Sequence, residues 1–187
     1  MLSIRRMDPT DAAVVARIHA DSWRSAYRGI LRDEYLDDAV DGDRLALWMK
    51  RFAGNAAKQR GFIAEDGASV VGASVVGFAY VLLGEHSRWG HLLDNLHVAP
   101  RQRGSGVGRA LLQAATAALL QESGNFGLHL WVFEQNEGAR RFYERLGAKP
   151  VDSEVVEVPG GGSAPAWCYA WTTLQELRAR LDDRRDA

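Results

Sequence analysis

The sequence is short of the features that mark several broad classes of protein. It has one cysteine, Cys168, so no disulfide can form within the chain, which fits a reducing compartment and predicts a cytoplasmic protein. No apolar run approaches the roughly 18 residues of a membrane span, and Arg5, Arg6 and Asp8 place charge where a signal peptide needs an apolar segment. The formal net charge is -1. We therefore expect no membrane and no nucleic acid as partners, and one globular domain over residues 1–187.

Acidic residues are also missing between Asp94 and Glu122, where arginines and glycines gather instead. An apolar strand ends near Val98 and leads through this turn into a helix that we expect to begin at about Gly108. Glycines let the main chain approach an anion without a Cβ atom in the way, and the first N–H groups of a helix have no intrahelical partner. Together with the helix dipole, these groups predict a cradle for a pyrophosphate.

Two common nucleotide-binding motifs are absent from this turn. A Walker-type loop needs a glycine five residues after Gly104, and Arg109 stands there. The dinucleotide fingerprint Gly-x-Gly-x-x-Gly also fails, because its last glycine falls on Arg109 or Leu111. Taken alone, the turn also fits an ordinary strand, turn and helix without a ligand.

Two motifs together resemble the GNAT superfamily of N-acyltransferases. Residues 103–108, Arg-x-x-Gly-x-Gly, are similar to its acetyl-CoA signature Gln/Arg-x-x-Gly-x-Gly/Ala. Residues 136–148 are similar to its pattern Asn-x-x-Ala-x-x-Phe-Tyr-x-x-x-Gly-Phe/Ala. In this segment Asn136 is the predicted helix N-cap, Tyr143 follows two turns later on the same face, and Gly147 stands where a helix C-terminus favours glycine. Two motifs in this order argue against an accidental match.

The resemblance implies an α/β fold of the α+β type. Its sheet is mixed and mostly antiparallel, has about seven strands and is flanked by helices. The fourth and fifth strands, which end at Val98 and Phe133, are expected to run parallel and to splay into a V that admits the cofactor.

The resemblance also implies acetyl-CoA as co-substrate and no metal. The turn is expected to give main-chain N–H groups to the pyrophosphate, and the strand before it to give main-chain groups to the pantetheine. The expected cofactor contacts are Leu96, His97 and Val98 in the strand, Arg103, Gly104, Ser105, Gly106, Val107, Gly108 and Arg109 in the turn, and Asn136 and Tyr143 in the second motif.

Acyl transfer to an amine needs a proton acceptor, a donor to the oxyanion and an acid for the leaving thiolate. The resemblance makes Tyr143 the general acid, with plain packing against the sheet as the alternative. By the period of two along a strand, Asp94 shares a face with Leu96 and Val98. We expect it to point toward the acceptor as base or amine-orienting carboxylate, or else to form a cap or salt bridge. The same period puts His97 on the opposite face as a packed histidine.

Two functions stay open at this point. The first is an N-acetyltransferase that moves an acetyl group from acetyl-CoA to a primary amine of a small molecule or of a peptide or protein end, by direct attack in a ternary complex. The second is a GNAT-fold acyl-CoA-binding sensor or structural module without turnover. Leu92 keeps the second open, because some family members carry a second polar catalytic group at that position. A homodimer is also left open.

Two segments have no assigned role. Residues 68–72, Ala-Ser-Val-Val-Gly, are repeated as residues 73–77, and a shift of five exchanges the two faces of a strand unless a bulge or a longer hairpin tip absorbs it. Residues 159–165 join two expected closing strands and form either a flexible connector or a lip over the acceptor site.

Overall fold

Seven strands form one sheet in the computed structural model, which describes residues 1–67 and 74–183. Their spatial order is β1-β2-β3-β4-β5-β7-β6, and the neighbours are antiparallel except for β4 and β5, which run parallel. The strands are β1 (Leu2–Arg6), β2 (Gln59–Asp66), β3 (Ser74–His86), β4 (Gly90–Val98), β5 (Leu128–Phe133), β6 (Lys149–Glu157) and β7 (Ser163–Trp171). This sheet confirms the expected mixed, mostly antiparallel architecture.

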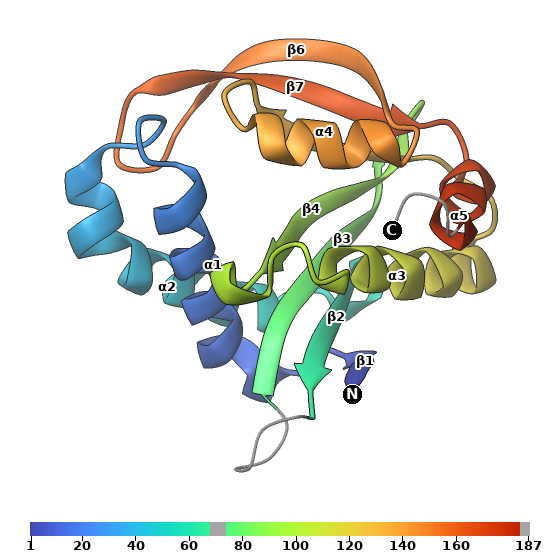
Figure 1. The fold of residues 1–187 in the computed structure, drawn as a ribbon, viewed down its shortest axis with the longest axis horizontal. Coiled ribbons are helices and arrows are strands. Elements are labelled where there is room, and N and C mark those ends of the chain that lie inside the picture. The colour runs from blue at the N-terminus through green and yellow to red at the C-terminus, as the bar shows by residue number, and fades with distance from the viewer. Residues whose placement is uncertain (68–73, 184–187) are drawn as a thin grey trace.

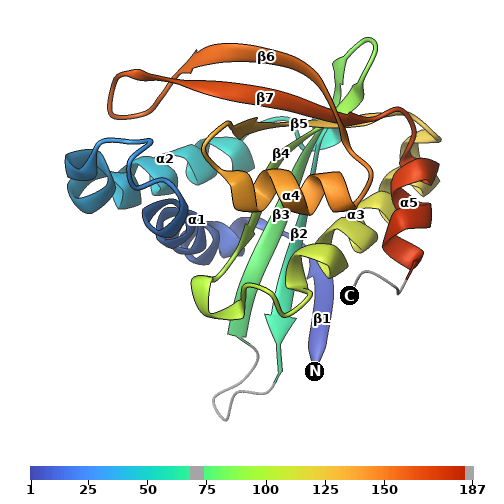
Figure 2. The same cartoon turned by 45° about the horizontal axis from the view of Figure 1, so that its top comes forward.

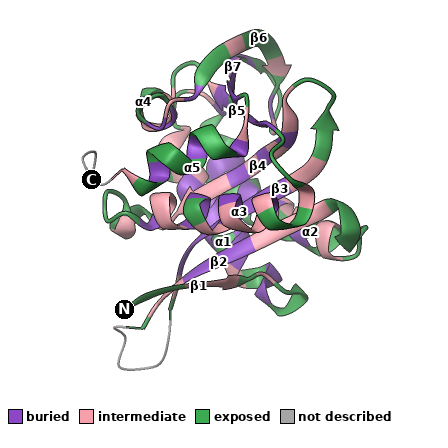
Figure 3. Ribbon diagram, turned by 90° about the vertical axis from the view of Figure 1, so that its right-hand side faces the viewer, coloured by how far each residue is buried: buried purple, intermediate pink, exposed green. Residues whose placement is uncertain are grey.

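Helices cover both faces of the sheet (Figure 1). The α-helices are α1 (Ala12–Ala26), α2 (Val40–Phe52), α3 (Val107–Ser123), α4 (Glu137–Arg145) and α5 (Leu174–Asp182). On one face Trp48 of α2 meets Phe78 of β3 edge to face, with ring centroids 5.2 Å apart. On the other face Leu111 of α3 and Leu177 of α5 are fully buried in a second cluster. Figure 3 shows the buried residues along the central strands and on parts of α3 and α5.

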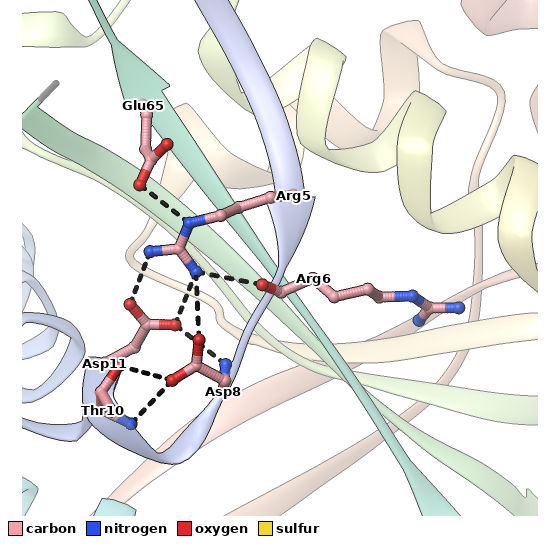
Figure 4. Close-up of polar contacts among 6 residues, drawn as sticks. All are labelled: Arg5, Arg6, Asp8, Thr10, Asp11 and Glu65. Atoms are coloured by element: carbon pink, nitrogen blue, oxygen red, sulfur yellow. Dashed lines mark hydrogen bonds and ion pairs between the residues drawn. The ribbon is translucent and has the colours of Figure 1, made fainter.

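The start of α1 is fixed by a short turn and an arginine. Asp8 caps a 3-10 turn (Pro9–Asp11) whose first residue is a proline, and the turn leads directly into α1. Arg5 of β1 donates to both carboxylate oxygens of buried Asp11, at 2.8 and 2.7 Å, and to Glu65 of β2 at 2.8 Å (Figure 4). One guanidinium therefore ties two strands to the first turn before α1.

The parallel strands β4 and β5 pair only at their beginnings. The register joins His91 to Leu128 and Leu92 to His129, and the ladder ends there. Both strands continue for several residues beyond this point, so they diverge toward their carboxyl ends. The predicted V-shaped splay is confirmed.

A β-bulge at Asp94 overturns the expected parity of β4. Tyr80 of β3 pairs with Asn95, but the next residue, Val81, pairs with Leu93, so Asp94 is the extra residue. Leu93 therefore packs with Leu96 on the α3 side. The expectation that Asp94 shares the face of Leu96 and Val98 is wrong, because a strict period of two holds only in an unbroken strand.

The second motif folds as predicted. The side chain of Asn136 caps α4 by accepting from the Ala139 N–H at 3.3 Å, and Gly147 follows the helix with φ +82°. Such a backbone conformation favours glycine at the end of a helix. The two expected closing strands pair as the β6–β7 hairpin, and helix α5 follows β7.

The repeat at residues 68–77 falls partly outside the described residues. Its first copy, and the hairpin tip that was expected there, lie within residues 68–73. In the second copy β3 begins at Ser74 and carries a bulge at Val76, since Ala64 pairs with Gly77 and Glu65 with Val75. A bulge of this kind absorbs a one-residue slip.

Candidate active site

A cleft of about 770 Å³ opens where β4 and β5 separate. Its walls come from α1, β4, β5 and α4, and its floor at one end is the turn before α3. The lining includes all of the residues expected to contact the cofactor, together with Asp94. The structure therefore gathers the two sequence motifs and the splayed strands around one cavity.

The turn before α3 directs main-chain N–H groups toward this cleft. Gly106 is the N-cap of α3 with φ +85°, and no side chain caps the helix. The N–H groups of the first turn thus have no partner inside the helix and carry the positive end of its dipole. A Cβ atom built on Gly104 or Gly106 meets nothing within 4 Å, whereas one on Gly108 lies 3.6 Å from the Phe142 ring. There is free space next to Gly104 and Gly106, whereas Gly108 packs against Phe142 of α4.

The two arginines of the turn point their side chains elsewhere. Arg103 donates to Ser25 Oγ at 2.9 Å and to the Ser22 carbonyl at 3.3 Å, both on α1. Arg109 donates to the carbonyls of Arg180 and Leu181 at the end of α5, each at 2.9 Å. Their guanidinium groups therefore hold the turn between two helices, and main-chain groups are what the turn offers a ligand.

Tyr143 of α4 lines the cleft and is buried. Its ring meets Phe142 edge to face, with centroids 5.2 Å apart, and Trp171 at 6.2 Å. Burial, and then the nearby Tyr27, raise the pKa of the Tyr143 phenol above its ordinary value. The phenol is thus neutral and carries its proton throughout the neutral range.

Tyr27, the residue after α1, reaches across the same cleft and was not anticipated from the sequence. Burial raises the pKa of its hydroxyl to about 12, although the nearby Asn136 side chain and the charge of Arg103 act to lower it. Tyr27 stands four residues after Trp23, on one helix face, but only the folded chain brings it to α4.

Asp94 is held by an arginine that the sequence analysis also missed. The carboxylate accepts from the Arg51 guanidinium of α2 and from the side-chain amide of Asn95. Arg51 in turn lies over the rings of Trp48 and Tyr80, at 4.8 Å from each centroid. The expected alternative of a salt bridge at Asp94 is therefore present, and Asp94 still lines the cleft. No sequence signal ties a helix arginine to a strand 43 residues later.

His97 lies on the α1 side of β4, as the sequence predicts for a packed histidine. Its Nδ1 is 3.0 Å from Ser22 Oγ, and its ring lies 4.4 Å from that of His19. Burial, together with the charges of Arg103, Arg44 and Arg51, lowers the pKa of His97 to about 3. The imidazole is neutral at ordinary pH. Because its ring packs against α1, the expected cofactor contact of His97 is made by its main chain.

The fold and the cleft define an acyltransferase of the acetyltransferase type. The Acetyltransferase (GNAT) family model matches residues 17–148, and the chain belongs to this family. The chain is 28% identical over 184 residues to Uncharacterized N-acetyltransferase YuaI of Bacillus subtilis (strain 168), covering 97% of this chain and 99% of that protein. It is 31% identical over 147 residues to Probable N-acetyltransferase Rv2775 of Mycobacterium tuberculosis, covering 77% and 78%.

A solved structure shares the fold. The PaiA N-acetyltransferase from Thermoplasma acidophilum, in complex with coenzyme A, superimposes with a TM-score of 0.72 at 18% identity, over 91% of this chain and 99% of that one. Within residues 1–67 and 74–183, no helix has the length and apolar character to cross a membrane.

Proposed function

We propose that this chain transfers the acetyl group of acetyl-CoA to a primary amine of a small molecule or of a peptide or protein end, by direct attack in a ternary complex. The observation that carries the proposal is the cleft between β4 and β5. It joins an open glycine turn at an uncapped helix terminus to a buried tyrosine at the point where the strands have separated.

The cofactor placement follows from the chemistry of the cleft. The pyrophosphate lies on the main-chain N–H groups of residues 103–109, where the dipole of α3 favours an anion. The pantetheine runs along Leu96, His97 and Val98, which pair with β3 on one edge and, because β5 has diverged, have no strand partner on the other. Asn136 contributes to the same arm. Coenzyme A in the PaiA structure, which shares the fold, supports this assignment.

The reaction moves one acetyl group and one proton. The neutral amine attacks the thioester carbon, and the oxygen becomes an oxyanion that accepts from a main-chain N–H of β4. The C–S bond then breaks, and the electron pair leaves with the CoA sulfur. Tyr143 donates a hydrogen bond to that thiolate, and the proton lost from the amine nitrogen restores the thiol through the tyrosine or solvent. The products are an N-acetyl amide and free CoA.

The raised pKa of Tyr143 shapes its role. A buried phenolate is costly, so the tyrosine does not give up its proton before the sulfur develops charge. It therefore acts on the transition state, in which the thiolate forms.

Asp94 orients the acceptor. The Asp94 carboxylate accepts from Arg51 and has lone pairs left for an incoming N–H. It holds the attacking nitrogen over the thioester rather than removing its first proton. Bulk solvent or a neighbouring group removes the proton that converts the ammonium form of the acceptor into the neutral amine.

Thiol release from acetyl-CoA across a panel of amines tests the proposal, with acetyl-CoA affinity measured by calorimetry on the same preparation. Amine-dependent release of thiol is expected. Tight binding of acetyl-CoA without release for any amine would instead favour the sensor without turnover.

A further inference from the structure

One face of β5 carries a row of aromatic side chains. Helices α1 and α2 lie on one side of the molecule and α3 and α5 on the other (Figures 1 and 2). Alternate residues of β5 are buried in the cluster that also holds α3 and Tyr143, namely Leu128, Leu130 and Val132. By the period of two along a strand, His129, Trp131 and Phe133 point to the opposite face. Because the cofactor is assigned to the side of α3 and Tyr143, we call this opposite side the acceptor face.

Two of the three rings in this row are already covered by other rings. Phe133 meets Tyr27 edge to face, with centroids 5.0 Å apart. His129 is buried and meets His86 of β3 edge to face at 5.6 Å. Trp131 lies between them, lines the cleft and is 39% exposed. Its indole is therefore the aromatic surface that the row offers to a ligand in the cleft.

Asp94 stands across the split from Trp131. The last rung between the parallel strands joins Leu92 to His129, and Asp94 and Trp131 each follow by two residues. The contact of Asp94 with Arg51 of α2 puts its carboxylate on the acceptor face. Both Asp94 and Trp131 line the cleft. A carboxylate and an indole thus flank the point at which the strands separate.

Leu92 extends the apolar surface beside this point. It pairs with Leu82 of β3 on one edge and with His129 of β5 on the other, so the three side chains form a row across the sheet. Leu82 packs against the cluster of α1 and α2, which places this row on the acceptor face. Position 92 therefore adds apolar surface next to Asp94.

The charges of the cleft leave room for one ammonium group on the acceptor. Among the described residues that line the cleft, Asp94 is the only acidic one, and Arg51 is already its ion-pair partner. A second positive charge on the acceptor would lie over the apolar surface and close to Arg51, where both desolvation and repulsion oppose it.

We propose that the acceptor is a primary amine with an aromatic body and no second charge, and that Trp131 determines this specificity. This inference rests on the proposed acyl transfer. The acceptor nitrogen lies at Asp94, and its ring packs on the exposed face of the Trp131 indole, as aromatic pairs in binding sites do. A short link of carbon atoms between ring and nitrogen spans the two.

Two tryptophans on neighbouring strands give matched variants. Trp131→Ala removes the indole from the cleft, and Trp131→Phe puts a flat apolar ring back. Trp167→Ala removes an indole of the same size from β7. Trp167 pairs with Val132, its ring lies beside Arg140, and it is not among the described residues that line the cleft. Acetyl-CoA affinity, measured in all three variants, shows that the cofactor half of the site is intact.

The readout is kcat/KM for thiol release with phenethylamine, ethanolamine and diaminobutane. Phenethylamine and ethanolamine share a two-carbon link to the nitrogen and differ in the group beyond it. The wild type should prefer phenethylamine over each of the others by a factor on the order of 100. Trp131→Ala should lower this preference about tenfold through KM for phenethylamine, and Trp131→Phe should keep most of it. Trp167→Ala should leave it unchanged. Equal use of the three amines by the wild type, or equal losses in Trp131→Ala and Trp167→Ala, would overturn the proposal.

Failure of the acyl transfer itself gives a different pattern, in which no amine releases thiol in any variant. Specificity is then measured as binding to the wild type saturated with free CoA, so it does not depend on how well Trp131→Ala folds. The indole N–H resonance of Trp131 is assigned by its loss in Trp131→Phe. It should shift on titration with phenethylamine and stay in place with ethanolamine. A resonance that does not move, or that moves equally with both amines, would overturn the proposal.

Discussion

At the scale of single residues, Tyr143 carries the chemical step of this account. Tyr143→Phe removes the hydroxyl and keeps the ring that packs against Phe142 and Trp171. We expect kcat to fall about 10²- to 10⁴-fold with little change in acetyl-CoA affinity, because the lost interaction forms chiefly in the transition state. Steady-state kinetics and calorimetry measure the two effects separately. Wild-type turnover in Tyr143→Phe would contradict a role of the hydroxyl and would mean that the site acts only by positioning the two substrates.

The raised pKa of Tyr143 adds a pH signature at the same residue. Burial keeps the phenol protonated above its ordinary pKa, so its ionisation should not limit the rate at alkaline pH. We expect kcat of the wild type to show no fall between about pH 8 and pH 10. A fall in that window that disappears in Tyr143→Phe would contradict the assignment.

Asp94 is expected to matter through orientation. Asp94→Asn keeps the shape of the side chain but weakens its pull on an incoming N–H group. Activity should drop by a similar factor at neutral and at high pH, because solvent, and not Asp94, removes the first proton of the amine. Arg51→Gln is the companion variant, since it leaves the carboxylate in place without its ion pair. An Asp94→Asn variant with wild-type activity at every pH would remove Asp94 from the mechanism.

At the scale of elements, the turn before α3 is the binding device. Gly106→Ala and Gly124→Ala form a matched pair at opposite ends of α3, with φ of +85° and +80°, and neither added Cβ meets an atom within 4 Å. Both should lose about 1–2 kcal/mol of folding free energy from backbone strain. Only Gly106→Ala should weaken acetyl-CoA binding. Calorimetry and urea unfolding check both parts, and equal affinities in the two variants would move the pyrophosphate elsewhere.

Sequence periodicity predicts the elements of this fold better than it predicts their faces. The strands, the splay and the capped helix α4 follow from local patterns and from two motifs. The bulge at Asp94 does not, because pairing with β3, rather than the residues of β4, inserts the extra position. Tyr27 and Arg51 were also missed, since Tyr27 lines the cleft from the end of α1 and Arg51 reaches Asp94 from α2, both distant in the chain from the two motifs. These long-range contacts decide the acceptor side of the site.

At the scale of the whole molecule, buried histidines link stability to pH, because burial lowers the pKa of His19, His91, His97 and His129. Burial lowers the pKa of both His19 and His97, and for His97 the folded value is about 3. The unfolded chain takes up protons below a pKa of about 6.5 while the folded chain does not, so stability is full above that pH and falls as the pH drops below it. Well below pH 6.5, the contribution of His97 to this slope approaches about 1.4 kcal/mol per pH unit.

Urea unfolding between pH 5 and pH 7 measures how the free energy of unfolding changes with pH. His97→Gln should lower this slope by the contribution of one histidine. The same variant should lower the free energy of unfolding more than it lowers kcat, since the neutral imidazole packs on His19 and takes no proton in the reaction. A slope that His97→Gln leaves unchanged would place the protonating group elsewhere.

The most direct measurement of the central claim follows both products of one reaction. The chain is incubated with isotopically labelled acetyl-CoA, first alone and then with a primary amine, and thiol, acetylated amine and intact protein are quantified by mass spectrometry. Direct transfer in the cleft predicts no label on the protein without amine, and equal amounts of free thiol and labelled N-acetyl amide with it. Label retained on the protein, or acetyl-CoA bound without any acetylated amine, would contradict the account.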